Sequence, residues 1–187
     1  MLDIVLWGFI VLTSVVFILA ITKKKPKPPP RPALNGVVLL TVAGKISNPN
    51  KTEFDFAADT LFRKNSIYFP AAVEFDMEAL QAIGTKKVKF IGVPDPVEYE
   101  GPELKAVLKA AGSEYKLVTL YGSTKNQPLL QTVVEAETWI VATKRGGKNL
   151  TSGELGPLLL LNHPGGEAPA SEDRGRWVSG LYFIEAK

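Results

Sequence analysis

This chain can supply little imidazole or thiolate chemistry, because it holds one histidine and no cysteine. His163 stands in "LLNHPGG", where an expected strand enters a loop. A single imidazole can act as a base or a metal ligand, but no second histidine or cysteine completes a metal set. The sequence therefore predicts a loop histidine. The missing cysteine excludes disulfides, thiolate metal sites and cysteine nucleophiles.

Two segments contain residue types that can bind phosphate. "GSTKN" (122–126) lacks the G-x-x-x-x-G-K-[ST] spacing of a nucleotide loop. "KRGGK" (144–148) suits a phosphate or an acidic partner, although a hairpin turn accounts for it better. Ser123 and Ser171 have no nucleophile motif around them. The acid pairs Glu98–Glu100 and Glu172–Asp173 have the pattern of surface carboxylates. We therefore expect no catalytic, cofactor-binding or metal site.

Short helices and strands must position these residues. Residues 37–46 predict a strand and 51–72 give no clear pattern. Within residues 73–84, Asp76 is the N-cap of a predicted helix that has Met77, Leu80 and Ile83 at helical spacing and Gly84 as its end. Residues 101–112 predict a second helix, with Pro102 in its first turn and Gly112 at its end.

The remaining segments read mostly as strands. The expected strands are "KKVKFIGV" (86–93), "YKLVTLYG" (115–122), "TWIVATKRGGKNL" (138–150, with a Gly-Gly turn), "GPLLLLNHP" (156–164) and "RWVSGLYFIEA" (176–186). "LLQTVVEAE" (129–137) predicts a short helix or an apolar connector, and "GGEAPASEDRG" (165–175) an exposed loop. Many strands with two or three short helices predict an α+β domain.

Several of these phrases, in this order, resemble the oxidoreductase molybdopterin-binding domain of the sulfite-oxidase-like superfamily, in its small bacterial form. They are "LLTVAGKI", "EFDMEALQAI", "YEGPELKAVLKAAG", "WIVATKRGGKNLTSGELGPLLLLNHP" and "RWVSGLYFIEA". The resemblance covers about residues 36–187, with an apparent insertion near 50–72. It implies a fold of mixed β-sheets with short helices.

The resemblance also implies a molybdenum-ligating cysteine just before the "YEG" segment. The corresponding stretch here, "KKVKFIGVPDPVEYEG" (86–101), has no sulfur ligand, and a hard or neutral side chain does not replace a thiolate. The family holds the pterin phosphate with Arg and His donors, whereas Arg63, Arg145, Arg174 and Arg176 are scattered here. The resemblance therefore implies the fold without the chemistry or the cofactor.

The N-terminal region has the pattern of a membrane anchor. Ile4 to Ile21 is uncharged, and a helix of that length covers roughly 27 Å, close to the bilayer core. We expect a transmembrane helix over 1–22, a basic Pro-rich linker over 23–35 and the folded domain over 36–187. The n-region "MLD" has no basic residue and no A-x-A pattern follows, which argues against a cleaved signal.

The flanking residues predict the orientation of this anchor. Trp7 suits the membrane interface, and the basic residues follow the apolar run, namely Lys23, Lys24, Lys25, Lys27 and Arg31. This asymmetry predicts a single-pass protein of the cell inner membrane, with the N-terminus periplasmic and the domain cytoplasmic. These cations also suit anionic lipid headgroups.

The charge of the domain bears on its partners. After residue 32 the chain has 17 basic and 18 acidic residues, so nothing indicates nucleic-acid binding. We expect a non-catalytic accessory subunit, anchored in the membrane, that docks on the cytoplasmic side of a larger membrane protein complex; the resemblance suggests a bioenergetic host, respiratory or photosynthetic. Two alternatives stay open: a molybdopterin-dependent oxidoreductase or electron-transfer component with atypical ligation, and a ligand-sensing module that reuses the pterin cleft.

Overall fold

The computed structural model describes residues 34–91, 95–113, 117–123, 129–132, 138–153, 155–163, 168–169 and 177–187. Three short helices are described: α2 (Thr60–Lys64), α3 (Met77–Ile83) and α4 (Leu104–Ala110). The strands are β1 (Leu40–Gly44), β2 (Ala72–Phe75), β3 (Lys86–Ile91), β4 (Val97–Gly101), β5 (Leu117–Gly122), β6 (Leu129–Thr132), β7 (Thr138–Ala142), β8 (Lys144–Arg145), β9 (Lys148–Asn149), β10 (Leu159–His163), β11 (Ala168–Pro169), β12 (Val178–Ser179) and β13 (Leu181–Ala186).

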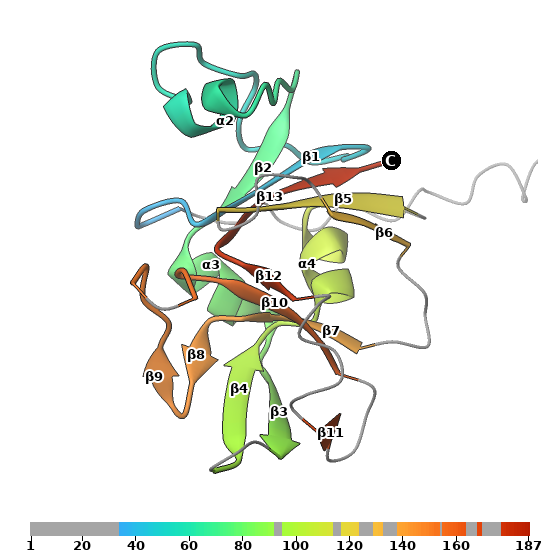
Figure 1. Ribbon diagram of the computed structural model, residues 1–187. Coiled ribbons are helices and arrows are strands. Elements are labelled where there is room, and N and C mark those ends of the chain that lie inside the picture. The colour runs from blue at the N-terminus through green and yellow to red at the C-terminus, as the bar shows by residue number, and fades with distance from the viewer. Residues whose placement is uncertain are drawn as a thin grey trace, which may run out of the picture.

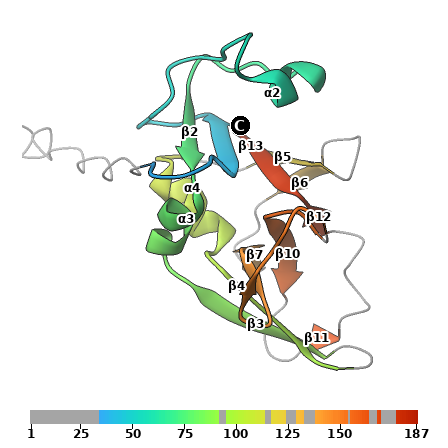
Figure 2. The same cartoon turned by 90° about the vertical axis from the view of Figure 1, so that its left-hand side faces the viewer.

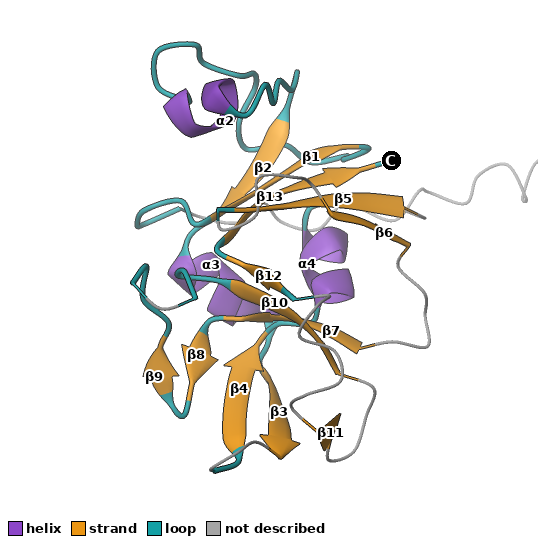
Figure 3. Ribbon diagram, in the orientation of Figure 1, coloured by secondary structure: helices purple, strands orange, loops and turns teal. Residues whose placement is uncertain are grey.

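These strands form three sheets (Figures 1 and 3). Sheet A has the order β2-β1-β13-β5-β6, sheet B the order β11-β3-β4-β8-β9, and sheet C the order β12-β10-β7. In sheet A, β1 pairs in parallel with β13, which brings the two ends of the described domain together. The other pairings in sheet A are antiparallel.

The sheets are stacked in layers, with α3 and α4 beside sheet C and under sheet A (Figures 1 and 2). The largest core joins the inner face of sheet A to both helices and to one face of sheet C; it includes Leu40, Val42, Leu80, Leu108 and Leu160. A second core joins the other face of sheet C to sheet B, through Phe90, Tyr99, Ile140, Leu159 and Leu161.

The run of leucines in β10 follows from this layering. Sheet C is covered on both faces, so successive side chains of β10, which point to opposite faces, are all buried. Leu160 contributes to the first core, and Leu159 and Leu161 to the second. The prediction of a buried strand within 156–164 is confirmed for Leu159–His163.

The start of α3 is fixed by one carboxylate. Asp76 Oδ1 accepts a hydrogen bond from the Ala79 backbone N–H at 2.8 Å, as an N-cap residue does. Its Oδ2 accepts from the N–H groups of Asn35 and Gly36, at 2.6 and 2.8 Å. The predicted N-cap is confirmed, and it also ties the entering chain to the helix. The preceding residues, 72–75, form strand β2, which pairs with β1.

The predicted fold class, an α+β domain preceded by a transmembrane helix, is wrong. The described part of the chain is mostly β-sheet, and its helices have only five to seven residues. One segment contributes to the error: 129–132, expected to be a helix or a connector, is strand β6 because it pairs with β5. The closing strand also divides into β12 and β13 at Gly180, which has φ +62°.

The predicted single-pass inner-membrane topology is corrected as well. Within the residues that the structure describes, no helix is long and apolar enough to cross a bilayer. The longest has seven residues, or about 10 Å, against about 30 Å of hydrocarbon. The segment predicted to span, 1–22, and the basic linker as far as residue 33 lie outside the described residues, as do Trp7, Lys23, Lys24, Lys25, Lys27 and Arg31.

Candidate functional site

The "KRGGK" segment forms the hairpin β8–β9, as predicted. Gly146 and Gly147 have φ of +56° and +77°, the left-handed pair that a two-residue type I′ turn requires. This tight turn makes Arg145 and Lys148 direct cross-strand partners. Their side chains therefore lie on the same face of sheet B.

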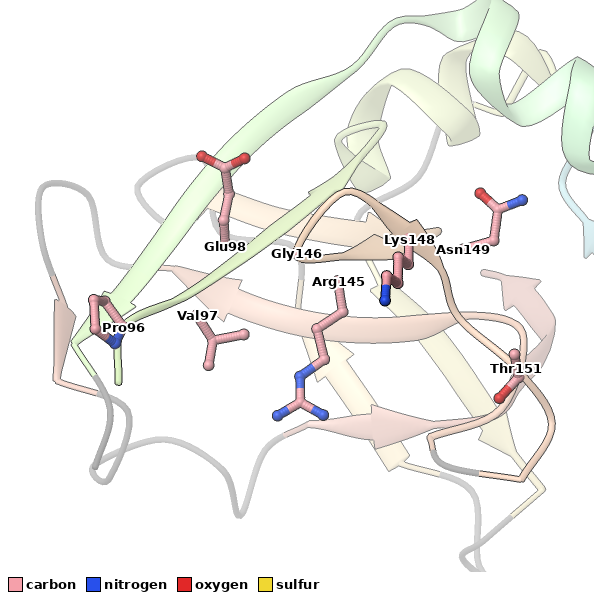
Figure 4. Close-up of a pocket in the computed structure, with 8 residues that line it drawn as sticks. All are labelled: Pro96, Val97, Glu98, Arg145, Gly146, Lys148, Asn149 and Thr151. Carbon is pink, nitrogen blue, oxygen red and sulfur yellow. The ribbon is translucent and has the colours of Figure 1, made fainter. Parts of the chain in front are cut away.

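A pocket of about 430 Å³ lies against this hairpin. It is lined by Pro96, Val97, Glu98, Arg145, Gly146, Lys148, Asn149 and Thr151 (Figure 4). Arg145 pairs with Tyr99 of β4, so it shares a face with Tyr99 and with Val97, two residues before it. Figure 4 shows Arg145, Lys148 and Val97 on one side of the strands and Glu98 on the other.

The acids near this pocket are neutralised on the opposite face of sheet B. Lys87 Nζ lies 3.0 Å from Glu98 Oε1 and 3.4 Å from Glu100 Oε1. The hydrogen bond to Glu98, together with that to Glu100, raises the pKa of Lys87 above its usual value. Glu98 thus forms an ion pair with Lys87, whereas Arg145 and Lys148 form no ion pair with any described residue. The pocket side of the hairpin therefore presents two cations that have no ion-pair partner among the described residues, while Glu98, which also lines the pocket, pairs with Lys87.

The second candidate is an aromatic lid, residues 51–70, that covers the outer face of sheet A. It contains α2, at the top of Figure 1. Phe62, Ile67 and Phe69 are buried in a third apolar cluster with Ala72 and Phe183 of the sheet. The Phe69 and Phe183 rings stack with centroids 5.9 Å apart. The insertion inferred near 50–72 is thus folded onto the sheet.

The outer surface of the lid is apolar and exposed. The side chains of Phe56, Leu61 and Tyr68 are 65%, 46% and 61% exposed. The ring of Phe54 supports this surface from below, edge-to-face with Tyr68 at 5.0 Å. The Arg63 guanidinium lies 4.9 Å from the Phe56 ring centroid and donates to the Phe56 carbonyl at 3.0 Å. The lid thus presents aromatic side chains beside a cation.

Partly buried ion pairs hold the base of the lid to the sheet. Lys51 Nζ lies 2.6 Å from Asp59 Oδ1 and 3.0 Å from Glu74 Oε1 of β2. Burial lowers the pKa of Lys51, but the hydrogen bonds to Asp59 and Glu74 outweigh it, and the pKa is raised. A small pocket of about 170 Å³ lies where the lid meets sheet A, between Tyr68, Tyr121 and Glu185. Burial, with a contribution from Glu185, raises the pKa of Tyr121.

His163 is not a loop residue as predicted, since it ends strand β10 and is buried. Its ring lies edge-to-face with Phe90 at 5.1 Å, and its Nε2 is 3.5 Å from the Lys89 carbonyl oxygen. Among the described residues, no group of three His, Asp or Glu side chains could hold a metal. The strand pairing with β7, which the sequence does not display, accounts for its position.

The other predicted positions are not brought together. Ser123 donates its backbone N–H to the Gly180 carbonyl at 2.9 Å. Arg63 belongs to the lid and Arg145 to the hairpin, at opposite ends of the fold in Figure 1. Ser171, Glu172, Asp173, Arg174, Arg176 and residues 124–126 lie outside the described part.

The residues where the resembled family places its metal do not fit molybdenum. The segment 86–101 includes β3 and β4, and its side chains are Lys, Val, Phe, Ile, Asp, Pro, Glu and Tyr. None is a sulfur donor, and an oxygen or nitrogen donor does not reproduce a thiolate toward this metal. We therefore derive no chemistry through such a cofactor.

A search of protein-family models found no match to this chain, and a search of curated proteins found no relative.

Proposed function

We propose that this chain is a non-catalytic interaction subunit, which docks on a larger protein complex through the aromatic lid. The observation that carries the proposal is the exposure of Phe56 and Tyr68 on a segment whose other aromatic residues are buried or partly buried. Contiguous apolar groups at a protein surface mark interaction sites, and aromatic residues dominate the binding energy of interfaces.

The construction of the lid supports a binding role. Phe62 and Phe69 attach it to sheet A, so the exposed rings are positioned before a partner arrives, and less conformational entropy is lost on binding. Arg63 stands at the edge of the apolar surface. The partner that suits this surface is a protein with an apolar depression and a carboxylate at its rim, since arginine pairs well with carboxylates at interfaces.

The described residues give no support to an enzymatic alternative. A catalytic serine, for example, needs a base within hydrogen-bond reach and a group that orients the base. His163, the one histidine, is buried against Phe90. We therefore expect the purified protein to hold no stoichiometric molybdenum. Elemental analysis measures the metal-to-protein ratio directly. A metal-to-protein ratio near one would favour the oxidoreductase reading.

The docking surface is tested by removing its exposed rings. The double variant Phe56→Ser, Tyr68→Ser should leave the thermal midpoint within a few degrees, because both side chains are mostly exposed. We expect wild-type protein to co-migrate with a larger complex in native extracts of the source cell, and the variant to migrate alone. Val37→Ser is the matched control, since Val37 is 81% exposed and lies outside the lid.

A photoreactive phenylalanine analogue placed at position 56 identifies the partner. It should yield one dominant crosslinked protein, and the same analogue at position 37 should not. Wild-type protein that migrates as a free monomer, or a double variant that co-migrates as well as wild type, would contradict the proposal.

A further inference from the structure

The hairpin pocket is far from the lid and has a different chemistry. Its hairpin lies at the lower end of the molecule in Figure 1, whereas the lid lies at the top. We infer that this pocket binds a small phosphate monoester, with the phosphate held by Arg145 and Lys148 and the apolar body of the ester resting on Pro96 and Val97. The inference is independent of the proposed docking function.

The first argument is the convergence of two cations. Arg145 and Lys148 are directly opposite each other across β8 and β9, and both line the pocket. Like charges directly opposite in a strand pair destabilise it. The hairpin itself gains nothing from this pair, whereas a dianion between the two side chains would remove the repulsion.

The second argument is the direction of the neighbouring acids. Glu98 and Glu100 lie on the other face of β4, and Lys87 neutralises them there. Glu98 also lines the pocket, but its carboxylate is engaged by Lys87, which leaves Arg145 and Lys148 as the cations available to an anion there. Arginine offers a planar fork of donors that matches phosphate oxygens, and lysine adds a point charge. Thr151 adds a hydroxyl-bearing residue to the lining.

The third argument is the size and composition of the pocket. Its volume of about 430 Å³ is within the range of small-ligand sites, roughly 300–1,000 Å³. Pro96 and Val97 give it an apolar wall. Inorganic phosphate would leave that wall in contact with water, whereas the organic part of an ester would cover it.

The test uses the full chain, isothermal titration calorimetry and amide NMR, with phenyl phosphate, inorganic phosphate and phenol as probes. We expect phenyl phosphate to bind more tightly than inorganic phosphate, and phenol not to bind. The amides of Gly146, Lys148 and Asn149 should shift most. Arg145→Gln should weaken phenyl phosphate at least tenfold, and Arg145→Lys should give an intermediate loss because it keeps the charge without the fork.

Lys105→Gln is the matched control, since Lys105 is an exposed cation of α4 outside the pocket. It should bind like wild type, and both Gln variants should keep the wild-type amide spectrum away from the hairpin. Equal affinities of Arg145→Gln and Lys105→Gln would overturn the site. Equal affinities for phenyl phosphate and inorganic phosphate, or binding of a polyglutamate peptide in preference to the ester, would overturn the ligand assignment.

Discussion

Replacing Asp76 should lower the free energy of unfolding by an amount that depends on pH. Its carboxylate accepts three backbone N–H groups, from Ala79 through Oδ1 and from Asn35 and Gly36 through Oδ2. An N-cap substituted by alanine costs about 1 kcal/mol, and a hydrogen bond to a charged group contributes roughly 1.5–3 kcal/mol. Water can reach the partly buried Asn35 and Gly36 amides again, so we expect a total loss of about 3 kcal/mol for Asp76→Ala.

Asp76→Asn separates the two roles of this side chain. Asparagine caps helices as well as aspartate does, and its one carbonyl oxygen can still serve Ala79. It cannot also accept from Asn35 and Gly36, so we expect a loss of about 1–2 kcal/mol. Glu53→Gln, at an exposed position outside these contacts, is the control and should stay within about 0.5 kcal/mol of wild type.

The sign of the pH dependence follows from the direction of the pKa shift. The hydrogen bond from Ala79, with those from Asn35 and Gly36, lowers the pKa of Asp76 below 3.8. A lowered native pKa contributes stability that is fully present above the unfolded value and is lost as pH falls through the native one. The difference between wild type and Asp76→Ala should thus be largest at pH 7 and shrink below pH 3.8.

The assay is urea unfolding followed by the fluorescence of Trp139 and Trp177, which are buried, at pH 7 and in steps to pH 3. A difference between wild type and Asp76→Ala that stays constant over this range would show that the charge of Asp76 is not what stabilises α3. If Asp76→Ala lowered the free energy of unfolding by less than about 1 kcal/mol at pH 7, the carboxylate would not be making the three hydrogen bonds assigned to it.

Four further predictions follow from single contacts. Gly101→Ala should cost about 3 kcal/mol in a urea titration, because the added Cβ would overlap the Val141 carbonyl. Phe69→Ala should cost a similar amount, and hydrogen exchange should show lost protection in the lid, whereas sheets B and C keep theirs. Lys51→Met should cost about 2 kcal/mol, since it leaves Asp59 and Glu74 without their cation; the wild-type advantage should persist at neutral pH and fade as pH rises above 10.5, through the raised pKa of Lys51. Lys148→Glu should raise the free energy of unfolding by about 0.5 kcal/mol, by replacing a repulsive cross-strand pair with an attractive one, and should abolish phenyl phosphate binding in calorimetry. Equal stability with retained binding would contradict both parts of that last prediction.

Local patterns were enough to predict several elements. The second helix follows from Leu104, Val107 and Leu108 at helical spacing, and the structure buries all three in α4. The Gly-Gly pair at 146–147 predicts a two-residue turn because few other residues adopt two successive positive φ values. In both cases the information lies within a few residues of the element that it determines.

Non-local pairing explains most of what the sequence did not predict. Residues 129–132 become β6 only because β5 lies alongside, and 72–75 become β2 because β1 does. Neither segment has a strict alternation of apolar and polar residues that would identify a strand by itself. The fold-class error arises here, since strand content depends on partners that are distant in the sequence.

The two candidate sites differ in how far the sequence could reveal them. The hairpin was visible as "KRGGK", but its pocket depends on Pro96 and Val97, about fifty residues earlier. The sequence of the lid contains five aromatic residues within positions 54–69, and the secondary-structure patterns take no account of this clustering. Which of them are buried is decided by sheet A, since Phe62 and Phe69 meet Phe183 while Phe56 and Tyr68 face outward.

The two sites lie on different layers of the fold, so substitutions can separate their roles. The lid is attached to the outer face of sheet A, and the hairpin lies at the β8–β9 end of sheet B (Figure 1). Sheet C and the two large cores stand between them. Substitutions that are far apart and share no partner have additive effects. A variant without Phe56 and Tyr68 should therefore bind phenyl phosphate with wild-type affinity, and Arg145→Gln should keep its docking partner. Coupling between the two would require the intervening cores to shift, which their close packing resists.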